Sequence, residues 1–246
     1  MHVSDESMFL SQRTSPGFTL LEILIALSIV ATVFTTLFAV FDRVTDVADA
    51  VDRQTNLSQE ARLVVLQIQK DLNAVVLPDQ ERHKKTKSSS IVPVSGQSPD
   101  MESIAKEKHV LTLTTWASLD LNIPFPGQQM NVVRYSLTPV NGTDHLYSLY
   151  RLERPALPRV SDQGPPLFQK TLLSSHISSL QIGFFDPEKE TLDSSWEPKE
   201  TRGQNISLKS PSWISLKLDF SSAPGQTRRF EIMSVLPMER EGTEKK

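Results

Sequence analysis

The chain has 246 residues, with 26 basic and 29 acidic side chains, so its formal net charge is −3. Nucleic-acid binding requires a basic surface, and this charge balance therefore argues against nucleic acid as a partner. Cysteine is absent, which excludes disulfides, thiolate metal ligands and cysteine nucleophiles.

Residues 18–41 form the most apolar segment, in which 18 of 24 side chains are apolar. A helix of this length spans about 36 Å, enough to cross a hydrocarbon core of about 30 Å. We expect its serine and threonines to hydrogen-bond back to their own helix. No small-x-small cleavage site follows, so the segment predicts a retained transmembrane helix. Arginines at 13, 43 and 53 flank it on both sides and leave its orientation open.

The helical pattern continues past Phe41, without Gly or Pro, until Pro78. This predicts one helix of about 60 residues, roughly 90 Å long, whose extension over residues 42–78 is amphipathic. We expect its apolar stripe to be buried against a sheet. The stripe consists of Val44, Val47, Val51, Ala61, Val65, Ile68, Leu72 and Val75, with Gln54 and Ser58 as its polar members.

Residues 79–108 are polar and charged, and we expect a mobile insert there. Its basic run, Arg82 to Lys87, is interpreted as a solvated loop because acidic residues surround it and no aromatic residue is interleaved.

Alternating patterns then predict six or seven antiparallel strands in a globular domain over residues 109–238, followed by a charged tail at 239–246. Asn141-Gly142 is typical of a hairpin turn. A long helix followed by such a sheet is an α+β layout. The clearest strand candidates are 110–116, 131–137, 145–155, 177–185, 213–220 and 228–237.

Catalytic motifs are absent: the chain has no phosphate-binding Gly loop, no GxSxG and no HExxH, and its histidines lack metal-ligand spacing. The acidic residues of segment 186–193 leave two interpretations, a calcium site or a solvated hairpin loop. We favour the loop because the spacing fits no standard calcium loop and Pro187 interrupts it. We therefore expect no catalytic residue, no cofactor and no metal.

The string Ser15-Pro-Gly-Phe-Thr-Leu-Leu-Glu22 spans the start of the apolar segment. A carboxylate in lipid costs several kcal/mol unless it is paired. Complementing the helix N-terminus would account for Glu22 but not for the string before it. The string resembles the type IV pilin and pseudopilin signature.

This resemblance implies that residues 1–17 are a leader, that a prepilin peptidase cuts after Gly17, and that the new N-terminal residue, Phe18, is methylated. It also implies that Glu22 pairs with the N-terminal amine of a neighbouring subunit in the fibre. Such pairing leaves neither charge isolated in an apolar medium.

Within the signature's superfamily, the strands resemble the J-type minor pseudopilin of type II secretion. The resemblance rests on VVRYSL, LYSLYRLERP, LLSSHISSLQIGFFD and SWISLKLDF. It implies a pilin-like fold and a non-enzymatic subunit of the pseudopilus tip, which helps to initiate fibre assembly and the export of folded proteins. Its partners would be I-type and K-type minor pseudopilins and the major pseudopilin.

The implied location is the bacterial inner membrane, crossed once, with the globular domain in the periplasm. The alternatives are a minor pilin of a type IV pilus, serving adhesion or DNA uptake, and a membrane-anchored periplasmic binding protein or enzyme.

A second apolar face lies nearly opposite the stripe on the same helix and consists of Leu63, Leu66, Ala74 and Leu77, with Lys70 among them. A helix that only covers its own sheet needs a single stripe. Either another part of the chain folds over this face, or, as the resemblance implies, partner helices pack there.

Overall fold

The computed structural model describes residues 17–77, 92–119, 130–143, 145–156, 167–197, 210–223 and 226–237. The chain forms two compact units, residues 1–52 and residues 53–246. The first contains the beginning of helix α1 (Leu20–Asn73), and the second contains the rest of α1 and the strands. The expected leader, except for Gly17, and the expected charged tail lie outside the described residues, as does the basic run from Arg82 to Lys87.

Helix α1 confirms the long helix predicted from the sequence, over 54 residues. It ends where the chain joins the sheet. The backbone N–H of Val76 donates to the carbonyl of Thr114 at 2.8 Å, and the N–H of Trp116 donates to the carbonyl of Ala74 at 3.0 Å. These two bonds, with the bridge between Val75 and Thr115, replace the next helical turn.

The sheet of the described residues has the order β7-β1-β2-β3-β4-β5-β8-β9, with β6 paired to β5, and every pair is antiparallel. Its six longer strands confirm the six predicted segments, whereas the three short ones had no clear pattern. The strands are β1 (Ser95–Gln97), β2 (Lys108–Thr115), β3 (Asn131–Pro139), β4 (Tyr147–Pro155), β5 (Gln169–Asp186), β6 (Thr191–Asp193), β7 (Ser195–Trp196), β8 (Trp213–Ala223) and β9 (Gln226–Val235).

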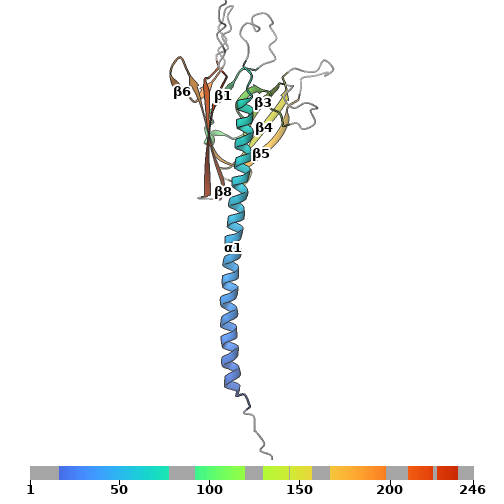
Figure 1. Ribbon diagram of the computed structural model, residues 1–246, viewed down its shortest axis with the longest axis vertical. Coiled ribbons are helices and arrows are strands. Elements are labelled where there is room, and N and C mark those ends of the chain that lie inside the picture. Colours follow the sequence, from blue (N-terminus) through green and yellow to red (C-terminus); the bar gives the residue numbers. More distant parts are fainter. Residues whose placement is uncertain are drawn as a thin grey trace, which may run out of the picture. The chain divides into compact units, whose positions relative to one another are not determined.

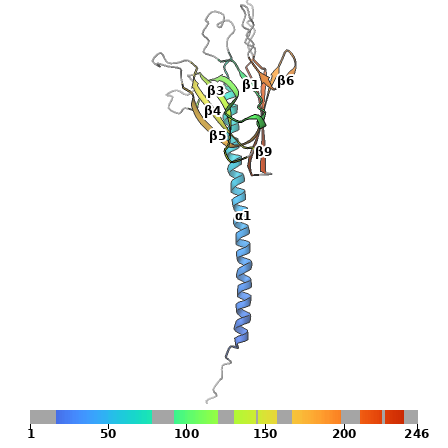
Figure 2. The ribbon, with the colours of Figure 1, turned by 180° about the vertical axis from the view of Figure 1, so that it is seen from behind.

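The end of α1 and the curled sheet share one core. Figures 1 and 2 show β3, β4 and β5 on one side of this part of the helix and β8 and β9 on the other. Ala61, Ile68, Leu72 and Val75 of the predicted stripe are buried, and Val65 is half-buried. The expected burial of the stripe's first members, Val44, Val47 and Val51, is wrong: all three are exposed, because burial along α1 begins only at Leu57.

Residues 92–108 belong to the globular fold, so the mobile insert expected from their polarity does not extend over them. Val94 and Ile104 are buried, β1 pairs with β2 and β7, and a short 3-10 helix, η1, covers Met101–Ser103. Gly96 allows β1 to approach the core closely, because an added Cβ would lie 2.7 Å from the Phe184 ring and from the Val110 carbonyl.

The hairpin predicted at Asn141-Gly142 is present between β3 and β4. Gly142 has φ +82°, a left-handed conformation that glycine adopts without steric cost. The N–H of Val140 donates to the carbonyl of Leu146 at 3.0 Å and closes the loop.

Candidate functional site

The start of α1 is capped by Thr19. Its Oγ1 accepts a hydrogen bond from the backbone N–H of Glu22 at 3.3 Å, and its carbonyl accepts from the N–H of Glu22 and of Ile23. A threonine followed three residues later by glutamate is the sequence of a capping box, and this side-chain bond is one half of it. Thr19 therefore has a structural role as the cap of α1.

Gly17 and Phe18, in contrast, are not explained by the fold. A Cβ added to Gly17 would meet nothing within 4 Å, and the backbone there is not left-handed. The Phe18 side chain is 78% exposed. The described contacts of the chain therefore give no structural reason for this pair.

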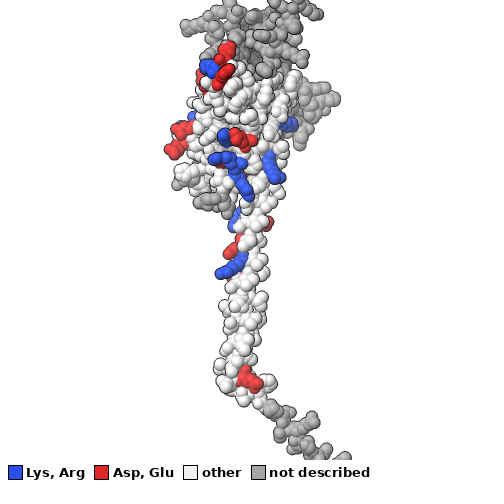
Figure 3. Space-filling model, turned by 60° about the vertical axis from the view of Figure 1, so that its left-hand side comes forward, with Lys and Arg blue, Asp and Glu red and all other residues white. Residues whose placement is uncertain are grey.

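The first part of α1 is suited to a membrane by length and composition. Its most apolar 18-residue window has a mean hydropathy of 2.5 and no buried residue. Glu22 is the only charged residue between Gly17 and Phe41 in the sequence, and Figure 3 shows a long uncharged surface along this part of the helix. As predicted, the hydroxyl groups bond to their own helix: Ser28, Thr32, Thr35 and Thr36 each donate to a preceding carbonyl at 2.8 Å.

The second apolar face predicted on the helix is exposed at two of its four members, and the other two, Ala74 and Leu77, lie beyond the end of α1 at Asn73. Leu63 and Leu66 are 69% and 60% exposed, while the side of the helix opposite them is buried against the sheet. Ala74 is half-buried, and Leu77 is partly buried and packs against the core. The exposed part of this face on α1 therefore consists of Leu63 and Leu66.

A buried group of polar side chains, which we call the clamp, joins α1 to β3 and β4. It consists of Asp71, Tyr135, Arg151 and Glu153. Asp71 accepts two hydrogen bonds from Arg151, from Nε at 2.7 Å and from Nη2 at 3.1 Å, and a third from the Tyr135 hydroxyl at 2.6 Å. Nη1 of Arg151 donates to Glu153. Asp71 and Arg151 are 0% and 1% exposed, so the pair is fully removed from water.

The electrostatics of the clamp keep the arginine charged. Burial opposes the positive charge of Arg151, but the hydrogen bond and charge of Asp71 outweigh it and raise the pKa of Arg151. Burial raises the pKa of Asp71, and Arg151 acts in the opposite direction. Burial and the charge of Asp71 raise the pKa of Tyr135 well above its ordinary value, so this phenol stays neutral and donates. Because arginine does not release its proton, Arg151 stays charged inside the clamp.

The clamp also fixes the chain that follows β2. Glu153 Oε2 accepts from the N–H of Leu119 at 3.1 Å, and Arg151 Nη2 donates to the carbonyl of Ala117 at 3.4 Å. Thr115 Oγ1 donates to the carbonyl of Asp71 at 3.0 Å. The end of α1, and with it the exposed Leu63 and Leu66, is thereby held at one position on the sheet.

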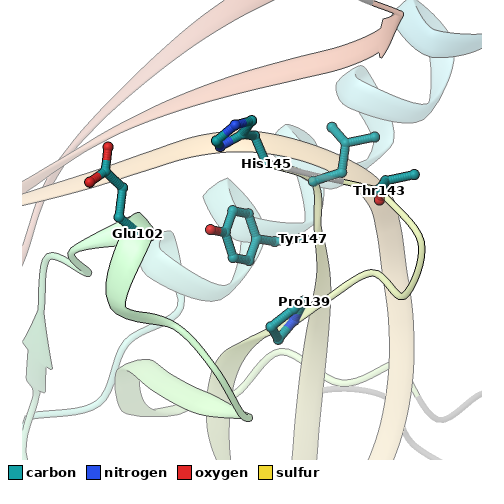
Figure 4. A pocket seen from close by; sticks show the side chains of 6 residues that line it. Glu102, Pro139, Thr143, His145 and Tyr147 are labelled. Atoms are coloured by element: carbon teal, nitrogen blue, oxygen red, sulfur yellow. The ribbon is translucent and has the colours of Figure 1, made fainter.

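A hollow of about 480 Å³ lies beside the β3–β4 turn (Figure 4). The Tyr147 hydroxyl in it already donates to the Met101 carbonyl, and burial raises the pKa of Tyr147. Glu102 and His145 stand apart on different segments in the view. The hydroxyl of Thr143 donates to the carbonyl of Val140 at 3.2 Å. The lining residues are Glu102, Pro139, Thr143, His145, Leu146 and Tyr147.

The acidic loop between β5 and β6 is partly neutralised by its own lysine. Lys189 Nζ lies 3.3 Å from Asp186 and 3.4 Å from Asp193, which favours the solvated-loop interpretation over the calcium interpretation. In the parts of the chain that the structure describes, no three His, Asp or Glu side chains are grouped to hold a metal ion.

A capped apolar helix that continues as an amphipathic helix and is followed by a curled antiparallel sheet defines a pilin-like α+β protein with an N-terminal membrane anchor. A family model for the prokaryotic N-terminal methylation motif matches residues 13–38, which include Gly17, Phe18 and Glu22. The family model described as type II secretion system (T2SS), protein J, matches residues 39–232.

The chain belongs to this protein J family and is a minor pseudopilin of type II secretion. Members of the family are structural subunits of the secretion system, which sets aside the alternative of a type IV pilus subunit. The comparison with curated proteins found no match.

Proposed function

We propose that this minor pseudopilin acts at the pseudopilus tip, where it binds I-type and K-type partners and the major pseudopilin and helps to initiate fibre assembly and the export of folded proteins. The observation that carries the proposal is the exposure of Leu63 and Leu66 on α1, opposite a fully buried side. Full burial of one leucine contributes about 1.5–3 kcal/mol, so two leucines on a partner helix contribute several kcal/mol.

The proposed partner face consists of Leu63, Leu66, Ala74 and Leu77. Leu63 and Leu66 are its exposed members on α1, and the partly buried Ala74 and Leu77 follow just after the helix ends at Asn73. The clamp supports this assignment, because it joins the end of the same helix to the sheet. A partner helix then meets a preformed surface and loses less entropy on binding.

The proposal for the N-terminus is processing by prepilin peptidase after Gly17, methylation of Phe18, and pairing of Glu22 with a neighbouring subunit's N-terminal amine. The open space around Gly17 supports recognition by an external enzyme. The cap made by Thr19 uses the backbone N–H of Glu22. In the proposed arrangement, residues 18–41 lie in the lipid of the bacterial inner membrane and the globular domain lies in the periplasm.

The subunit acts in this proposal by assembly and not by catalysis. Support comes from its membership of a family of structural subunits. In the described segments, the buried charged residues Asp71, Arg151 and Glu153 are used by the clamp to join helix and sheet, and Asp186 pairs with Lys189.

The test is Leu66→Asp in the full chain, co-purified in detergent with I-type and K-type partners. Its melting temperature should stay close to that of the parent, and association should weaken by at least about tenfold, or 1.4 kcal/mol. Leu192→Asp is the matched control, because Leu192 is 54% exposed but lies on β6. If folded Leu66→Asp binds both partners like the parent, the partner face is wrong.

A further inference from the structure

The outer side of the sheet, away from α1, carries two arginines on neighbouring strands. Side chains alternate between the two faces of a strand. Tyr135, Arg151 and Glu153 face α1 in the clamp, so Arg134 on β3 and Arg154 on β4 lie on the other face. They occupy diagonal positions in the ladder, because Arg134 pairs with Leu152 and Arg154 pairs with Val132.

Both arginines lie against one aromatic ring. The Cζ atom of Arg134 is 4.6 Å from the centroid of Phe168, and the Cζ atom of Arg154 is 5.2 Å from it. All three side chains are half-buried, and the neighbouring Leu167 is 89% exposed. Two guanidinium groups over one ring form a fixed surface that combines positive charge with apolar area.

These two charges have no acidic partner among the described residues. The only hydrogen bond that the Arg154 guanidinium makes to a described residue is to the carbonyl of Pro155, at 3.4 Å. Partial burial and the nearby charge of Arg134 lower the pKa of Arg154. The neighbouring Lys170 differs, since Glu107 pairs with it at 2.9 Å. The whole chain has a net charge of −3, so the positive charge at Arg134 and Arg154 is a local excess and not a general property of the surface.

We propose that Arg134, Phe168 and Arg154 form a docking site for an acidic segment of a protein partner. Carboxylates of the segment would pair with the two guanidinium groups, and an apolar side chain between them would cover Phe168 and Leu167. Arginine pairs with carboxylates in a bidentate manner, and arginine and aromatic residues dominate the binding energy of protein interfaces.

The number of charges favours a protein over a lipid surface. Recognition of anionic lipid relies on clusters of about four to eight basic residues, whereas among the described residues only Arg134 and Arg154 at this site lack an acidic partner. The site shares no residue with the partner face on α1, so the two proposals are tested separately.

The experiment uses the full chain in neutral detergent micelles and a fluorescein-labelled peptide of alternating Glu and Leu. Fluorescence anisotropy should detect binding that weakens as salt rises from about 50 to 500 mM. The same peptide with Gln in place of Glu should not bind. The Arg134→Gln/Arg154→Gln double variant should raise the Kd at least about tenfold, a loss of 1.4 kcal/mol. Arg228→Gln, at an exposed arginine on β9, is the matched control and should leave the Kd unchanged.

The melting temperature of the double variant should equal or exceed that of the parent, because two mutually repelling charges are removed. If the double variant does not fold, Arg154→Gln alone provides the test and should still weaken binding. An unchanged Kd in the folded variant, equal binding of the Gln peptide, or tighter binding to vesicles of anionic phosphatidylglycerol than to the peptide would overturn the proposal.

Discussion

Arg151 on β4 and Asp71 on α1 are 80 positions apart in the sequence, and Nε of the one lies 2.7 Å from Oδ2 of the other inside the core. Arg229 and Asp219 make a similar two-bond pair at 2.8 Å, but Arg229 is 72% exposed. The chain thus carries the same chemical pair in two environments. Comparing them separates the effect of burial from that of the pairing itself.

Arg151→Ala is expected to lower the free energy of unfolding by about 3–5 kcal/mol, because it leaves Asp71 and Glu153 buried without their cation. Arg229→Ala, the control, is expected to cost about 0–1 kcal/mol, since water replaces the lost partner at the surface. Urea unfolding of the full chain in detergent, followed by near-ultraviolet circular dichroism, measures both. Similar losses in the two variants would contradict the role assigned to the clamp.

Ionisation of Tyr135 is expected to lower the free energy of unfolding at alkaline pH. Its pKa in the folded chain is raised above the ordinary value of 10.0 by burial and by the charge of Asp71. Above that ordinary value the unfolded chain releases this proton first, so the folded state binds more protons and stability falls as pH rises. Below it, the contribution of Tyr135 is fully present.

The measurement is the unfolding free energy between about pH 8 and 11, a range that brackets the ordinary pKa of tyrosine. Tyr135→Phe should be less stable at pH 8 by about 1–3 kcal/mol, because Asp71 loses one hydrogen bond, and it should lose less stability on going to alkaline pH. Tyr150→Phe is the control, since Tyr150 lies outside the clamp under Lys170. An alkaline slope identical in parent and Tyr135→Phe would refute the assignment.

Local patterns in the sequence predicted the helix and the six longer strands, because each repeats over many residues. The short strands β1, β6 and β7 have two or three residues each, too few for a period to be visible. Val44, Val47 and Val51 continue the apolar repeat, yet they are exposed. A repeat shows that one side of a helix is apolar and does not show what covers that side.

The clamp shows a second limit of prediction from the sequence. Alternation along β4 places Arg151 and Glu153 on the same side as Leu149, which indicates buried charges that need a partner. That partner, Asp71, precedes Leu72 in α1, and the helical repeat of α1 ends before the first strand begins. No spacing rule joins residues so far apart. Arg151 and Tyr135 nevertheless lie within LYSLYRLERP and VVRYSL, two of the strings that carried the family resemblance.

Processing after Gly17 predicts a mature chain that begins at Phe18. Protein purified from its native host should show the mass of residues 18–246 with one methyl group. Gly17→Ala should leave the globular domain unchanged, because an added Cβ meets nothing within 4 Å, and should slow cleavage. Retention of the full 246 residues in the native host would reject the processing proposal.

Variants of Glu22 and Thr19 distinguish pairing between subunits in the fibre from capping of the helix. Glu22→Ala should leave membrane insertion intact, because it removes a charge from the apolar segment, and should weaken cross-linking to other pseudopilins. Thr19→Ala is the matched control: it removes the Oγ1 bond and costs the helix start about 1 kcal/mol, but it keeps the carboxylate. Equal cross-linking in Glu22→Ala and the parent would argue against pairing.

Burial along α1 predicts where the folded unit begins. The second compact unit begins at Arg53, and the first buried residue of α1 is Leu57. Chains that start at Val44 and at Arg53 should therefore be soluble and should melt at nearly the same temperature, because Val44, Val47 and Val51 are exposed and contribute no burial. A chain that starts at Ala61 should be less stable by about 2–3 kcal/mol, since it lacks the side chain of Leu57. Circular dichroism melting of the three chains measures this, and a Val44 chain clearly more stable than the Arg53 chain would mean that the exposed valines support the fold after all.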